Sequence, residues 1–107
     1  MQLRITQAAA HTLVQQADAL RRAGDEARAT RWERAADEVL YALLNWPKRG
    51  FPCAFPAPDL AGLRWTAMPG FPTHMVFHRY LPQQETVVLV HILPGIKNLP
   101  ALIKEDL

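Results

Sequence analysis

Residues 73–93 read THMVFHRYLPQQETVVLVHIL, and this stretch decides the fold. It contains two runs rich in β-branched, aromatic and aliphatic residues, 73–81 and 86–93, on either side of a loop that begins at Pro82. Two such runs joined by a short polar loop predict an antiparallel β-hairpin. If Leu81 pairs with Thr86 across the loop, Val76 lies opposite His91.

This register gives the hairpin two different faces. The apolar face, expected to pack on helices, consists of Met75, Phe77, Val88, Val90 and Ile92. The other face carries the imidazoles and is expected to be open; it consists of His74, Val76, His78, Tyr80, Val87, Leu89 and His91. A slip by one residue would mix the two sets. An open polar face is ordinary for an antiparallel sheet, and the alternative is a binding or proton-transfer surface.

The proline-free first half predicts two helices. Apolar residues recur at helical spacing after Thr6, which is a plausible N-cap, and Gly24-Asp25 can end one helix and cap the next. The second helix carries the apolar stripe and ends at Pro47; the stripe contains Trp32, Ala35, Ala36, Val39, Leu40, Leu43 and Leu44. The two helices are expected to form an antiparallel hairpin.

The remaining segments complete an α+β layout. Residues 2–5 predict a short strand, 48–62 a linker, 63–68 another strand and 99–107 a short terminal helix. The order β-α-α-β-β-β predicts a helical hairpin packed on one face of a small antiparallel sheet. A chain of 107 residues is expected to form a single domain, 1–107.

Composition narrows the function. The net charge is +2, with eight Lys/Arg against six Asp/Glu in residues 1–50 and four of each in 51–107. The single cysteine, Cys53, excludes an intramolecular disulfide. No membrane span and no signal peptide are expected, so the predicted compartment is the cytoplasm. His74 and His78 would lie about 13 Å apart on one strand, so no metal site and no cofactor are predicted.

The arrangement resembles the RelE/ParE family of type II toxin–antitoxin toxins, which includes plasmid-stabilisation systems. The residues that carry the resemblance are Leu63-Arg64-Trp65, the stretch GFPTHMVFHR at 70–79, the stretch VVLVHILPG at 87–95, and LLNWPKRG at 43–50 after the helical hairpin. The resemblance covers nearly the whole chain. His78 stands where the family usually has Tyr, and Pro94, Lys97 and Asn98 stand where it usually has His, Arg and Asp.

The resemblance implies two possible activities. One branch cleaves ribosome-bound messenger RNA with basic and aromatic side chains, for which the aligned candidates are Arg64, His78, Tyr80, His91 and Lys97. In that branch His78 or His91 would be the base, Tyr80 or a second His the acid, and the two cations would bind the phosphate. The ParE branch instead inhibits DNA gyrase and performs no chemistry of its own.

The depleted basic face and the extended linker favour the ParE branch, so we expect a gyrase inhibitor that is not an enzyme. The resemblance also implies a cognate antitoxin, whose extended or helical tail would cover apolar surface along Trp32 and Val39 and the strand edge. A messenger endonuclease that acts on the ribosome and a non-toxic binding module remain the alternatives.

Overall fold

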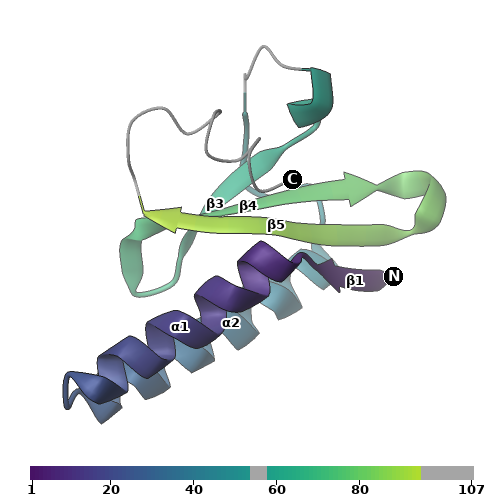
Figure 1. The fold of residues 1–107 in the computed structure, drawn as a ribbon. Coiled ribbons are helices and arrows are strands. Elements are labelled where there is room, and N and C mark those ends of the chain that lie inside the picture. The colour runs from purple at the N-terminus through teal and green to yellow at the C-terminus, as the bar shows by residue number, and fades with distance from the viewer. Residues whose placement is uncertain (54–57, 95–107) are drawn as a thin grey trace.

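A computed structural model describes residues 1–53 and 58–94 of the chain. Two helices, α1 (Gln7–Arg22) and α2 (Glu26–Asn45), lie side by side beneath one face of a sheet (Figure 1). The strands are β1 (Gln2–Ile5), β2 (Phe51–Pro52), β3 (Arg64–Met68), β4 (Phe71–Leu81) and β5 (Thr86–Pro94). Short 3₁₀ turns, η1 (Pro58–Leu60) and η2 (Pro82–Gln84), complete the elements. The expected α+β order, with a helical hairpin on one sheet face, is confirmed.

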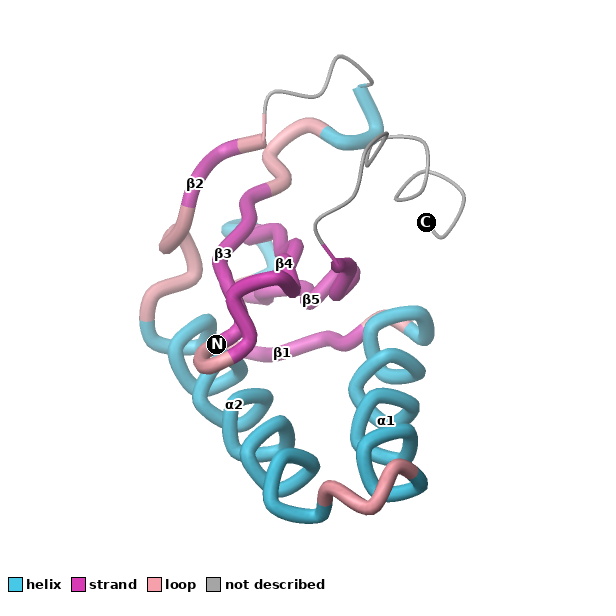
Figure 2. The backbone as a smooth tube through the Cα atoms, turned by 90° about the vertical axis from the view of Figure 1, so that its left-hand side faces the viewer, coloured by secondary structure: helices cyan, strands magenta, loops and turns pink. Residues whose placement is uncertain are grey.

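The helices begin and end where the capping signals predict. The Thr6 hydroxyl accepts a hydrogen bond from the Ala9 N–H at 3.1 Å, and the Asp25 carboxylate accepts one from the Arg28 N–H at 3.1 Å. Gly24 joins the two helices with φ of +81°, a conformation that favours glycine. The chain therefore reverses sharply, and both helices hang below the strands when the molecule is turned by 90° (Figure 2).

The sheet is mixed, with strand order β1-β5-β4-β3-β2. The prediction of an antiparallel sheet was wrong at one edge, because β1 pairs with β5 in parallel, Leu3 opposite Val87. The other neighbouring strands are antiparallel. The direction of this pairing has no local signal, because β1 has only four residues and most of the chain separates it from β5.

The β4–β5 hairpin follows the predicted register only near its loop. Leu81 pairs with Thr86 as expected, and the loop closes through η2. Farther along, the register shifts between Phe77 and His78. Val76 consequently lies opposite Ile92, so its predicted pairing with His91 was wrong. At this point β5 has one residue more than β4, so two residues of β5 lie opposite one of β4. This irregularity is a β-bulge.

Val90 is the extra residue, and the first turn of α1 accounts for it. The Thr6 hydroxyl donates to the Val90 carbonyl at 2.5 Å, and the Thr6 N–H donates to the Leu89 carbonyl at 3.1 Å. A carbonyl that leaves the strand ladder must find another donor when it is buried. The capping residue of α1 supplies that donor, so helix start and strand bulge are built together.

The faces of the hairpin are the reverse of those predicted. Val76, Val87, Leu89 and Ile92 pack on the helices in the same cluster as Trp32. Most of the predicted helix-facing set lies on the other side, in a second cluster made up of Leu60, Leu63, Phe77 and Val90, with Cys53, Trp65, Met75, Val88 and Leu93 packed against it. Both faces of the central strands therefore carry buried apolar clusters, and the expectation that the histidine-bearing face is open to solvent was wrong.

The predicted linker 48–62 is partly ordered into elements. Phe51 pairs with Trp65, which makes β2 the outer strand beside β3, and η1 places Leu60 in the second cluster. The close approach requires glycine before the strand, because a Cβ on Gly50 would clash with the Trp65 carbonyl oxygen. The predicted terminal helix, 99–107, lies outside the described residues.

Candidate partner-binding groove

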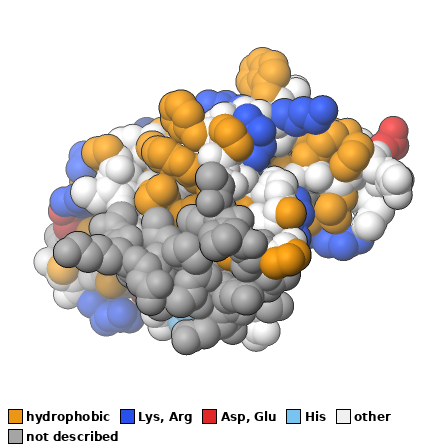
Figure 3. Space-filling view, turned by 90° about the horizontal axis from the view of Figure 1, so that it is seen from above, with side chains coloured by type: hydrophobic (Ala, Val, Ile, Leu, Met, Phe, Trp, Pro, Cys, Tyr) orange, Lys and Arg blue, Asp and Glu red, His pale blue; other side chains and the backbone are white. Residues whose placement is uncertain are grey.

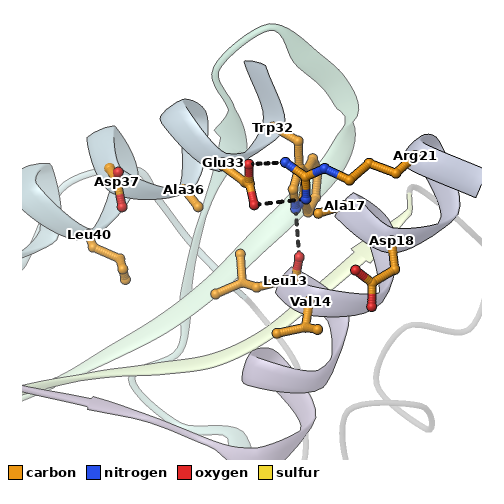
Figure 4. A pocket seen from close by; sticks show the side chains of 10 residues that line it. All are labelled: Leu13, Val14, Ala17, Asp18, Arg21, Trp32, Glu33, Ala36, Asp37 and Leu40. Atoms are coloured by element: carbon orange, nitrogen blue, oxygen red, sulfur yellow. Dashed lines mark hydrogen bonds and ion pairs between the residues drawn. The ribbon is translucent and has the colours of Figure 1, made fainter. Parts of the chain in front are cut away.

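A groove runs between α1 and α2 on the outer side of the helical hairpin (Figure 4). It has a volume of about 350 Å³ and is lined by Leu13, Val14, Ala17, Asp18 and Arg21 of α1 and Trp32, Glu33, Ala36, Asp37 and Leu40 of α2. The two sets recur at spacings of three and four residues, so each helix contributes one continuous stripe. The groove is thus formed where the stripe of one helix lies beside the stripe of the other.

The groove is apolar in its centre and acidic along its margins. Val14 leaves 60% of its surface exposed, and Leu13 and Leu40 are half-buried beside it. The exposed carboxylates of Asp18 and Asp37 lie on either side. An apolar strip with a charged rim fits one face of an amphipathic segment.

One arginine ties the two helices together at this groove. The Arg21 guanidinium binds the carboxylate of Glu33 on α2 at 2.6 Å and that of Glu26 at 3.1 Å (Figure 4 shows the Glu33 pair). The hydrogen bonds from Arg21 hold the pKa of Glu33 below its ordinary value. Because these groups are exposed to solvent, the ion pairs contribute little to stability.

Trp32 forms the wall between the groove and the core. Its side chain is fully buried, its indole Nε1 donates to the Leu13 carbonyl at 3.0 Å, and its ring meets Phe71 and His74 edge-on at 5.0 and 5.1 Å between centroids. Val39 is 5% exposed. The predicted antitoxin contacts at Trp32 and Val39 therefore belong to side chains that the sheet already covers.

His78 is a buried side chain with no polar partner. It is 0% exposed, and neither ring nitrogen has a hydrogen-bond partner within the described part of the chain. Burial, together with the nearby charges of Arg64 and Arg49, lowers its pKa to about 4. The imidazole is therefore neutral at neutral pH, and its surface is not exposed to solvent.

Arg64 lies opposite His78 on the neighbouring strand, but its charge is engaged elsewhere. The guanidinium donates to the carbonyls of Arg49 at 3.2 Å and Gly50 at 3.0 Å. Arg64 thereby fastens the turn after α2 to β3. In this arrangement the guanidinium binds backbone carbonyls and is not free to bind a phosphate.

His91 lies on the opposite side of the sheet from His78. It pairs with Phe77, whose ring belongs to the second cluster, whereas alternation along β4 places His78 on the helix side with Val76. His91 is 5% exposed, and its Nδ1 accepts a hydrogen bond from the Ile92 N–H at 2.9 Å. The two candidate bases cannot act at one reacting atom.

The other candidates do not complete a site. Tyr80 is half-buried and pairs with Val87, and Lys97 lies outside the described residues. His74 contacts Trp32 on the helix side, where burial and then the charge of Arg28 lower its pKa. The structure brings together Arg64 and His78, and it separates His91 from both.

Of the groove residues, Trp32 was predicted from the sequence to contact a partner, whereas Val14 and Asp37 were missed. Val14 and Asp37 each lie beside the core-facing stripe of their helix. An assignment that distinguishes only core from surface places such residues on the solvent-exposed side. The available signal was the repeat 14-17-18-21 on α1 and 33-36-37-40 on α2. A stripe wider than one packing partner needs indicates a second partner.

Comparisons with known proteins support the fold. No family model and no curated protein matches the chain. Among solved structures, a chain of the chromosomal ParDE toxin–antitoxin system from P. aeruginosa matches with a TM-score of 0.67 and 17% identity, over 88% of this chain and 95% of that chain. No described helix is both long and apolar enough to cross a membrane. The chain has a ParE-like α+β fold.

Proposed function

We propose that this chain is the toxin of a bacterial toxin–antitoxin module and that its antitoxin binds in the groove between α1 and α2. The observation that carries the proposal is the near-complete overlap with a chain of a ParDE system, at a TM-score of 0.67. The groove supports it independently, because its exposed Val14 and acidic rim suit an amphipathic antitoxin segment with basic side chains.

The proposed activity is inhibition of DNA gyrase by binding, without chemistry. General acid–base cleavage of a phosphodiester needs two titrating groups within hydrogen-bond reach of one substrate. His78 and His91 are buried on opposite faces of the sheet, and Arg64 is bonded to backbone carbonyls. These positions support docking to a macromolecular target over messenger cleavage.

Expression without antitoxin tests the activity. We expect growth arrest with an SOS response, intact messages, and inhibition of supercoiling when the purified chain is added to gyrase and relaxed plasmid. Cleavage of translated messages that disappears in His78→Ala or His91→Ala would instead establish the endonuclease. Normal growth with active gyrase would leave a non-toxic binding module.

A pair of variants tests the groove. The product of the adjacent reading frame should rescue growth and bind the chain, and Val14→Glu should weaken that binding at least tenfold while toxicity persists. Tyr41→Glu is the matched control, because Tyr41 is 67% exposed on α2 but does not line the groove. Equal loss of binding in both variants, or in neither, would remove the groove from the proposal.

A further inference from the structure

The turn that follows α2 presents an exposed aromatic side chain together with two cations. Trp46 is 60% exposed, and Lys48 and Arg49 are exposed beside it. Together with Asn45 and Pro47 these residues line an open hollow of about 510 Å³. The hollow lies beyond the C-terminal end of α2 and shares no residue with the groove of the helical hairpin.

The conformation of the turn is fixed by hydrogen bonds to α2, within the turn and to β3. The Trp46 N–H donates to the Ala42 carbonyl at 2.8 Å, and the Arg49 N–H donates to the Trp46 carbonyl at 3.0 Å. The Arg64 side chain on β3 donates hydrogen bonds to the carbonyls of Arg49 and Gly50. Gly50 has a φ of +83°, which lets the backbone lie close against β3. A fixed turn loses little conformational entropy when a partner binds.

A second exposed aromatic side chain follows the turn in sequence, on β2. Phe51 is 62% exposed, and its ring lies 5.1 Å from that of Trp65, centroid to centroid, at an interplanar angle of 35°. The space-filling view shows that hydrophobic and basic side chains are adjacent on the face seen from above (Figure 3). Trp, Arg and aromatic side chains held rigid at a surface are the usual composition of binding hot spots.

We propose that this aromatic–basic patch, Trp46, Lys48, Arg49 and Phe51, docks an acidic peptide segment of another protein. An apolar side chain of the segment would cover Trp46, and its carboxylates would pair with Lys48 and Arg49. Charge complementarity selects the partner, since both charges that line the hollow are positive. The inference is independent of the toxin proposal, because it uses neither the groove nor the fold comparison.

A nucleic acid fits the patch less well. Stacking on Trp46 and Phe51 would suit single-stranded bases, but binding to phosphates needs a broader basic surface than two cations. The third cation nearby, Arg64, is bonded to carbonyls, and the whole chain carries a net charge of only +2. A peptide that combines carboxylates with an apolar anchor matches both properties of the patch.

Peptide selection tests the proposal. A phage library of random 16-residue peptides is panned on the immobilised full chain, and a synthetic peptide from the selected pool is titrated by fluorescence anisotropy. We expect Asp and Glu to flank an apolar residue in the selected peptides. Trp46→Ala and Lys48→Glu/Arg49→Glu should each weaken binding at least tenfold. Arg22→Glu/Arg31→Glu reverses two exposed cations on the helices outside the hollow; it is the charge-matched control and should not weaken binding.

A charge exchange separates recognition from loss of fold. A peptide with its acids replaced by lysine should bind the Lys48→Glu/Arg49→Glu variant better than the wild type. Selection without an acidic consensus, or no selected binder, would overturn the proposal. So would tighter binding of a 20-nucleotide (dT) probe that depends on Trp46, or a concentration-dependent dimer that the patch variants abolish.

Discussion

The buried imidazole of His78 should make the chain unstable in mild acid. Desolvation is the main reason that its pKa falls from 6.5 to about 4, and Arg64 on β3 and Arg49 in the adjoining turn add repulsion against the protonated form. The unfolded chain therefore binds a proton at pH values where the folded chain does not. Stability contributed by the neutral imidazole is complete above about pH 6.5 and is lost as the pH falls towards 4.

The size of the effect follows from the difference in pKa. Each pKa unit corresponds to about 1.4 kcal/mol, so a shift from 6.5 to about 4 amounts to roughly 3 kcal/mol between neutral pH and pH 4. In addition, both ring nitrogens are buried without hydrogen-bond partners in the described part of the chain. An apolar residue of similar size removes that desolvation cost of about 1–3 kcal/mol.

Urea unfolding, monitored by tryptophan fluorescence at pH 7.5, 6.0 and 4.5, measures both quantities. In His78→Leu we expect equal or higher stability at pH 7.5, and a loss between pH 7.5 and 4.5 that is smaller than the wild-type loss by about 2–3 kcal/mol. His11→Gln is the control, because His11 is exposed on α1. Equal pH dependence in wild type and His78→Leu would refute the reasoning, as would strong destabilisation of the variant at pH 7.5.

Two further predictions concern the backbone. Gly50→Ala should lower the melting temperature more than Gly62→Ala, because both glycines have φ near +80° but only the Gly50 position would bring a Cβ against the Trp65 carbonyl; the difference should be at least about 1 kcal/mol in thermal unfolding, and equal losses would contradict it. Thr6→Ala should cost about 2 kcal/mol in urea unfolding and Asp25→Ala about 1, because both remove a helix cap but Thr6 also donates to β5. Equal costs would mean that the bulge does not depend on this hydroxyl.

Local signals predicted the elements well. The caps at Thr6 and Asp25, the Gly24 reversal and the hairpin loop pairing Leu81 with Thr86 all depend on residues close in sequence. The parallel pairing of β1 depends on contacts across most of the chain, and so does the cover that η1 gives to the second face of the sheet. Neither has a local sequence signature.

The assignment of the sheet faces was wrong for a related reason. The face assignment assumed that histidines mark a wet surface, yet burying a neutral imidazole costs only the loss of its hydrogen bonds with water. His78 and His91 accordingly lie inside the protein. The groove, by contrast, is formed by helix residues such as Val14 that look like ordinary flank until the second helix is placed beside them.

Val90 explains why the two histidines lie on different faces of the sheet. The bulge at Val90 changes the parity of β5, so that His91 turns away from the helices while His78 on β4 remains towards them. The Thr6 hydroxyl donates a hydrogen bond to the carbonyl of the bulged residue, Val90. The separation of the two imidazoles therefore depends on a contact between the start of α1 and β5. Among the described residues, His78 and His91 therefore do not meet as an acid–base pair at the sheet. The exposed surfaces that the structure offers to a partner are the groove between the helices and the turn that presents Trp46.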